Sequence, residues 1–99
     1  MDNLIKVFAS LGDSTRFAIV MRLMTNGPLP AGDLQDVADI SAPAISRHLK
    51  VLREAGVISQ TIDRQRRIYA VDPSVIETIH AWTLAHKGFW QGGEHFEPS

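Results

Sequence analysis

The sequence predicts a mainly α-helical domain that carries a single two-stranded β-hairpin. Apolar residues recur at spacings of three and four in several segments, which is typical of amphipathic helices. Capping and turn-forming residues separate these segments from one another. Two runs rich in β-branched residues, 57–62 and 67–71, flank the polar residues 63–66, and this pattern indicates a hairpin.

Two helices are expected before residue 28. Apolar residues predict a first helix at about residues 3–11, which Gly12 ends and which is too short to be stable alone. Asp13 or Ser14 is well placed to cap a second helix, and residues 26–28 end it. The expected buried face of this second helix consists of Phe17, Ile19, Val20, Leu23 and Met24.

A third and a last helix complete the expected set around the hairpin. The third is short, at about residues 30–37, with Leu34 and Val37 facing inward, and a turn at residues 38–40 follows it. The last begins after Asp72 at about residue 74 and extends to about residue 90. Gly92 then opens a polar tail.

The segment 41–55 predicts a capped amphipathic helix at about residues 42–55. Ser41 is placed as its N-cap, Pro43 is tolerated in the first turn, and Gly56 suits a left-handed end. One stripe of this helix is apolar and is expected to be buried: Ile45, Leu49, Leu52 and Ala55. The opposite side is small, hydroxylated and basic: Ala42, Pro43, Ser46, Arg47, Lys50 and Arg53. A helix with such a surface is suited to a DNA groove.

A helix-turn-helix followed directly by a hairpin is the order of a winged helix-turn-helix, with the wing at about residues 57–71. The length of 99 residues suits one domain, 1–99. The composition, 44% hydrophobic and 21% charged, is ordinary for a globular chain. Cysteine is absent, which excludes disulfides and thiolate metal ligands. No apolar run reaches the roughly 18 residues of a membrane span and no leader pattern opens the chain, so we expect a cytoplasmic protein without a membrane partner.

The charge is unevenly distributed along the chain. The net charge is −1, but residues 41–70 carry six basic and two acidic side chains, a net of +4. The remaining residues carry four basic and nine acidic side chains, a net of −5. A basic face on an acidic body directs one surface toward a polyanion such as DNA.

Four motifs make the chain resemble the ArsR/SmtB family of bacterial winged-helix repressors over nearly its full length. They are Leu11-Gly12-Asp13-Ser14-Thr15-Arg16, the run from Ser41 through Arg47-His48-Leu49 to Leu52, Ala55-Gly56-Val57, and Arg64-Gln65-Arg66-Arg67-Ile68-Tyr69. The resemblance implies a homodimer built on the first helix (about 3–11) and the last helix (about 74–90). It also implies two recognition helices spaced for successive major grooves of an imperfect palindrome.

The candidate DNA contacts lie on the recognition helix and on the wing. Ser46, Arg47 and Lys50 are the main candidates, and Ala42 and Pro43 permit close apolar approach to the bases. For His48 two roles stay open, phosphate contact and structural packing. The wing arginines are expected to meet a phosphate or the minor groove, although Arg67 has the alternative of pairing within the protein. The full set is Ser41, Ala42, Pro43, Ser46, Arg47, His48, Lys50, Arg64 and Arg66.

Aromatic residues near the C-terminus predict the dimer interface. Two tryptophans and a phenylalanine exceed what a small helical core can cover. Packing within one chain is the alternative, and His86 is expected to be packed and hydrogen-bonded among the aromatic side chains. The expected interface residues are Leu4, Phe8, Ile79, Trp82, His86, Phe89 and Trp90.

The sequence contains residue types that bind metal ions, but not at the spacing of the metal sites in the ArsR/SmtB family. Residues 31–33 lack the family's paired cysteines, and Thr78 and Gln91 stand where the last-helix metal site of the resembled family has ligands. We therefore expect no metal or other cofactor. A non-standard site remains an alternative, with ligands drawn from Glu77, His80, His86, Glu94, His95 and Glu97.

The sequence therefore predicts a metal-independent, homodimeric repressor that binds double-stranded DNA at an inverted-repeat operator. It identifies no small-molecule or metal effector. Two alternatives stay open: a winged-helix module for protein–protein interaction that does not bind DNA, and the metal sensor just described. An enzyme is not expected, because no phosphate loop, nucleophile elbow or carboxylate pair is present.

Overall fold

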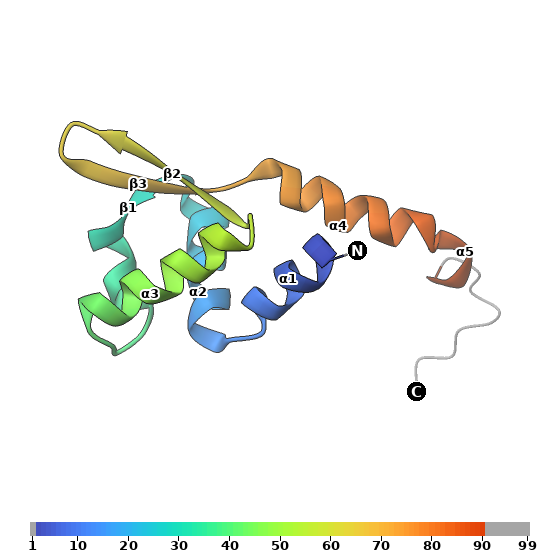
Figure 1. Cartoon of the computed structure of the whole chain (residues 1–99), viewed down its shortest axis with the longest axis horizontal. Coiled ribbons are helices and arrows are strands. Elements are labelled where there is room, and N and C mark those ends of the chain that lie inside the picture. Colours follow the sequence, from blue (N-terminus) through green and yellow to red (C-terminus); the bar gives the residue numbers. More distant parts are fainter. Residues whose placement is uncertain (1, 91–99) are drawn as a thin grey trace.

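Helices and one small sheet alternate along the chain in the order of a winged helix-turn-helix, which confirms the predicted fold class (Figure 1). The computed structural model describes residues 2–90. The elements are α1 (Asp2–Leu11), α2 (Ser14–Asn26), β1 (Leu29–Pro30), the 3-10 helix η1 (Ala31–Val37), α3 (Ala42–Glu54), β2 (Ile58–Asp63), β3 (Arg66–Val71), α4 (Pro73–Ala85) and α5 (Lys87–Trp90).

Side-chain caps begin three of the helices, two of them as predicted. The Asp13 carboxylate accepts hydrogen bonds from the backbone N–H groups of Arg16 and Thr15 at 3.0 and 2.9 Å, and these bonds, led by that from Arg16, hold the pKa of Asp13 below its ordinary value of 3.8. Ser41 Oγ accepts from Ala44 N at 3.3 Å. At the start of α4, the backbone N–H of Ser74 donates to Asp72 at 2.9 Å and lowers the pKa of that carboxyl group in the same way.

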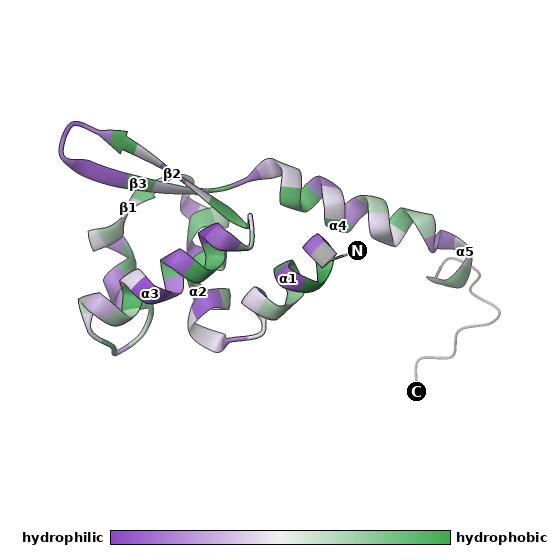
Figure 2. Cartoon of the chain, viewed as in Figure 1, coloured by the Kyte–Doolittle hydropathy of each residue, from purple (hydrophilic) through white to green (hydrophobic). Residues whose placement is uncertain are grey.

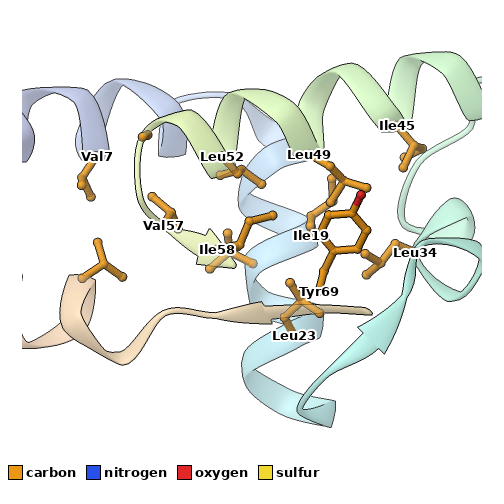
Figure 3. Packing of buried hydrophobic residues seen from close by; sticks show 13 residues of the cluster. Val7, Ile19, Leu23, Leu34, Ile45, Leu49, Leu52, Val57, Ile58 and Tyr69 are labelled. Carbon is orange, nitrogen blue, oxygen red and sulfur yellow. The ribbon is translucent and has the colours of Figure 1, made fainter. Parts of the chain in front are cut away.

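The core lies where α2, η1, α3 and the sheet meet (Figure 3). Ile45, Leu49 and Leu52 form the buried stripe predicted for α3. They share the cluster with residues of α2, η1 and β3, among which Ile19, Leu34 and Tyr69 are labelled in Figure 3. Gly56, with φ 78°, follows α3 in the left-handed conformation that the sequence predicted. Burial on one side of α3 therefore fixes which side is left for solvent.

The segment between α2 and α3 differs from the prediction in two ways. Residues 31–37 form a 3-10 helix rather than an α-helix. The two preceding residues form strand β1, which pairs antiparallel with β3, so the sheet has three strands in the order β1-β3-β2 rather than two. A two-residue strand is too short to show alternation in sequence. Pro30 also suggests a turn, although an edge strand tolerates proline.

The predicted buried face of α2 is partly wrong. Ile19, Val20 and Leu23 are buried, whereas Phe17 is 52% exposed and Met24 is 55% exposed. At about 100° of rotation per residue, Phe17 and Met24 lie roughly 100° around the helix from the centre of the buried stripe. They are therefore surface residues of the protomer.

The last helix ends earlier than predicted. α4 ends at Ala85, and His86 separates it from the single turn of α5. The carbonyl oxygen of Trp82 accepts a hydrogen bond from the His86 ring at 2.9 Å, and that of Thr83 accepts one from the Trp90 indole at 2.7 Å. Side chains thus occupy carbonyl groups that a continuing helix would bond through its backbone.

α4 projects away from the body of the molecule, beside α1 (Figure 1). The molecule measures 53 × 26 × 25 Å, and its radius of gyration is 15.9 Å, against about 12–13 Å expected for a compact chain of this length. Apart from Val75, no residue of α4 is buried. Within residues 2–90, no helix has both the length and the apolar character that crossing a membrane requires.

Candidate nucleic-acid interface

The exposed face of α3 carries the main candidate residues together. Pro43, Ser46, Arg47 and Lys50 follow one another at steps of three, one and three, so they lie on one side of the helix, and all four are exposed. Ala42 is also exposed, in the first turn, directly after the cap residue Ser41. The structure therefore brings together small residues at the N-terminus of α3 and two cations further along the same face.

His48 does not lie on this face. Its position is roughly 100° around the helix from Arg47 and roughly 160° from Lys50. The ring is partly buried, and its Nδ1 atom lies 3.3 Å from Arg16 Nη1 and 3.9 Å from Asp13 Oδ1, both near the start of α2. Of the two roles considered for His48, these contacts favour packing.

A hydrogen bond joins the recognition helix to the wing. Arg53 Nη1 donates to Gln60 Oε1 at 3.0 Å, from the last turn of α3 to strand β2. Sequence reasoning placed Arg53 on the outward basic face and gave Gln60 no role. No local signal identifies this pair, because only the folded hairpin brings the two side chains together.

The wing is a tight hairpin with an arginine at its tip. The pairing of Asp63 with Arg66 leaves Arg64 and Gln65 as a two-residue loop. Arg64 has φ 62°, a left-handed conformation that costs a side-chain-bearing residue roughly 1–2 kcal/mol. The tip of the hairpin and the adjoining start of β3 are hydrophilic (Figure 2).

Strand alternation separates the other two wing arginines. In the register of the two strands, Arg66 stands opposite Asp63 and Arg67 stands opposite Ile62. Neighbouring residues of a strand point to opposite faces of the sheet, so Arg66 and Arg67 lie on different faces. Arg67 shares its face with the buried Tyr69, so it extends the side of the sheet that packs on the body. Within residues 2–90 Arg67 forms no ion pair, which leaves its positive charge uncompensated. The alternation of side chains along a strand is the sequence signal that could have predicted on which face Arg67 lies.

The residues expected at a dimer interface lie on α1, α4 and α5 and at His86 between the last two, but Leu4 is not available on the surface. Leu4 is only 9% exposed, because its side chain packs within the protomer, whereas its neighbour Ile5 is 65% exposed. The Phe8 and Trp82 rings meet edge to face with centroids 5.5 Å apart, and Ile79 packs partly buried against the core. An apolar hollow of about 480 Å³ lies further along the same end, lined by Trp82, Thr83, His86, Phe89 and Trp90.

The candidate metal ligands are only partly covered by the structure. Among residues 2–90, no three histidine or acidic side chains come together as a metal site would require. His80 and His86 are exposed, and the His86 ring is engaged with the Trp82 carbonyl group. Glu94, His95 and Glu97 lie outside the described residues.

Comparison with known proteins agrees with this geometry. Residues 11–61 match the family described as a helix-turn-helix domain. HTH-type transcriptional regulator Rv2034 of Mycobacterium tuberculosis is 37% identical over 91 residues, which cover 87% of this chain and 84% of that protein. The fold and the exposed face of α3 define a winged helix-turn-helix protein. The crystal structure of the ArsR family transcriptional regulator RHA00566 superposes with a TM-score of 0.79 at 26% identity, over 91% of this chain and 92% of that one. The chain belongs to the ArsR family of helix-turn-helix transcriptional regulators.

Two further proteins are similar to this chain. Transcriptional repressor SdpR of Bacillus subtilis is 36% identical over 78 residues, which cover 79% of this chain and 86% of that protein. The solution structure of a homodimeric winged helix-turn-helix DNA-binding domain, Mb0332 from Mycobacterium bovis, has a TM-score of 0.69 at 16% identity. It covers 99% of this chain and 88% of the other. At that identity the likeness concerns the fold.

Proposed function

We propose that this regulator represses transcription by binding an inverted-repeat operator as a homodimer, with residues 1–99 acting as one domain. The observation that carries this proposal is the exposed face of α3, where Ser46, Arg47 and Lys50 stand beside the small residues of the first turn. Hydroxyl, guanidinium and ammonium groups at these positions suit base edges and phosphates of the major groove.

The wing supplies the second contact in this proposal. Arg64 at the tip and Arg66 beside it carry two cations toward the edge of each half-site, where phosphates or a narrow minor groove accept them. The bond between Arg53 and Gln60 holds the wing at a set angle to α3. The protein acts in the cytoplasm by occupying DNA and has no catalytic step.

The projecting helix α4 supports the homodimer. Trp82, Leu84, Phe89 and Trp90 are each at least 42% exposed on α4 and α5, and large exposed apolar residues gathered in this way mark an interaction surface. Ile5 and Phe8 continue this apolar surface onto α1. In this proposal a second copy of the chain covers this surface by two-fold symmetry. The Mb0332 domain, which has a similar fold, is described as homodimeric.

Selection of DNA by the purified protein tests the proposal. A random duplex library is expected to yield an inverted repeat whose half-sites are about 10 base pairs apart, with two chains per duplex in sedimentation. Binding is expected to be unchanged by zinc or by a chelator, since we propose that the regulator is metal-independent. Failure to enrich any sequence, or enrichment of a site that binds one chain, would contradict the proposal.

Replacing Arg64 by glycine separates the wing's charge from its fold. Glycine adopts φ 62° freely, so Arg64→Gly is expected to keep or raise the melting temperature. It removes one cation per protomer, so the slope of log affinity against log salt is expected to become shallower by about 2 for the dimer. Arg64→Lys keeps the charge and is expected to keep the slope. An unchanged slope for Arg64→Gly would place the wing tip away from DNA.

A further inference from the structure

Arg16, in the first turn of α2, contacts the two neighbouring helices α1 and α3. Its Nε atom donates a hydrogen bond of 2.6 Å to the carbonyl oxygen of Ser10 in the last turn of α1. Its Nη1 atom lies 3.3 Å from His48 Nδ1 on α3. Its backbone N–H donates to Asp13, the N-cap of α2. One side chain therefore joins α1 to the recognition helix.

The contact with Arg16 determines which nitrogen of His48 carries the proton. A guanidinium group has donors and no acceptor, so the Nδ1 atom that it approaches must accept and carries no proton. In the neutral form of the ring, the proton then lies on Nε2. The Asp13 carboxylate is 3.9 Å from the same nitrogen, beyond hydrogen-bond distance, so the competing bond from Nδ1 to Asp13 is not made.

The contacts of Arg16 with Ser10 and His48, called the Arg16 joint below, lie between the proposed dimer surface and the proposed DNA-binding face. Ser10 is only 3% exposed and stands two residues after Phe8, which belongs to the proposed dimer surface. His48 stands between Arg47 and Leu49, so a rotation of α3 about its axis that moves His48 also moves the face that carries Arg47. Arg16 therefore lies in the contact region between α1 and α3, next to residues of both proposed surfaces.

We propose that Arg16 is a positioning residue for DNA recognition, acting through His48. It holds α3 at the angle to α1 that two half-sites require. This inference rests on the proposed function. The planar guanidinium group is suited to the task, since it reaches the Ser10 carbonyl group and the His48 ring from one rigid fork, which the single ammonium group of lysine cannot reproduce.

Two measurements on Arg16→Met test the proposal, with Arg22→Met as the matched control. Arg22 also lies on α2, and its side chain is paired on the surface with Asp36 at 2.9 Å, so its loss removes the same charge without touching the Arg16 joint. Arg16→Met is expected to weaken binding of the duplex selected by the wild type by about tenfold, the effect of losing a hydrogen bond to a charged group. Arg22→Met is expected to change it by less than about threefold.

The second measurement is the tautomer of His48, read from ¹⁵N chemical shifts of the ring and assigned by their loss in His48→Asn. The wild type is expected to show the Nε2-protonated form, and Arg16→Met a mixture of both forms. If Arg16→Met fails to fold, Arg16→Lys is examined in the same two assays, with the same losses expected.

The proposal is overturned if the tautomer is unchanged and the affinity equals that of Arg22→Met. If the wild type itself selects no duplex, the proposed function fails. The tautomer measurement then still shows whether Arg16 holds His48.

Discussion

Arg47→Ala combined with Lys50→Ala is expected to weaken binding of the selected duplex by at least about a hundredfold. Both side chains lie on the exposed face of α3, and within residues 2–90 neither forms an ion pair. Each contact of this kind is worth roughly 1–3 kcal/mol, and a dimer loses four of them. A gel-shift titration at fixed salt measures the effect.

The matched control for this pair is Arg22→Ala, which removes a cation from α2 outside the candidate interface. It is expected to leave the affinity within about threefold of the wild type. Because Arg47 and Lys50 are exposed and the buried stripe of α3 is untouched, the melting temperature of the double variant is expected to stay close to that of the wild type. Unchanged DNA binding by this folded double variant would mean that α3 is not the reading helix.

Trp82→Ala combined with Phe89→Ala is expected to convert the dimer to a monomer at micromolar concentration. Trp82 is 42% exposed and Phe89 is 70% exposed in the protomer, so both are available to a second chain. Large aromatic residues at the centre of an interface typically cost about 2 kcal/mol or more each when truncated. With four such residues lost per dimer, the dissociation constant is expected to rise by at least about a thousandfold. Sedimentation velocity measures the shift.

Phe17→Ala provides the control for exposed aromatic surface. Phe17 is 52% exposed on α2, outside the proposed dimer surface, and its removal is expected to leave the dimer intact.

The variant that combines Trp82→Ala with Phe89→Ala is also expected to lose most operator binding, since one half-site offers too few contacts. A dimer that survives in this variant but dissociates in Phe17→Ala would move the interface to α2.

Local signals made the recognition helix predictable from sequence. Its cap, its buried stripe and the glycine that follows it all depend on residues within one or two turns of each other, and the structure has each of them as predicted. The hairpin was predictable for the same reason, because β-branched runs around a polar tip need no distant partner to be recognised.

Features that depend on distant partners were not predictable. Strand β1 is defined only by its pairing with β3, some 40 residues later. The end of α4 depends on the rings of His86 and Trp90, which take carbonyl groups of the preceding turn. In the candidate site, His48 contacts Arg16, which lies 32 residues earlier on α2. The sequence motif around His48 does not indicate this contact. Secondary structure was thus easier to predict than the side-chain bonds that join its elements.

The bond between Arg53 and Gln60 has a consequence for exchanging specificity between relatives. A recognition helix transplanted alone from one repressor to another would bring its reading residues but lose the partner that fixes the wing beside it. The arginines of the wing would then approach a different part of the duplex, although their own sequence had not changed. If α3 of this chain contacts DNA as proposed, the segment to transfer is therefore α3 together with Gln60, rather than the helix alone.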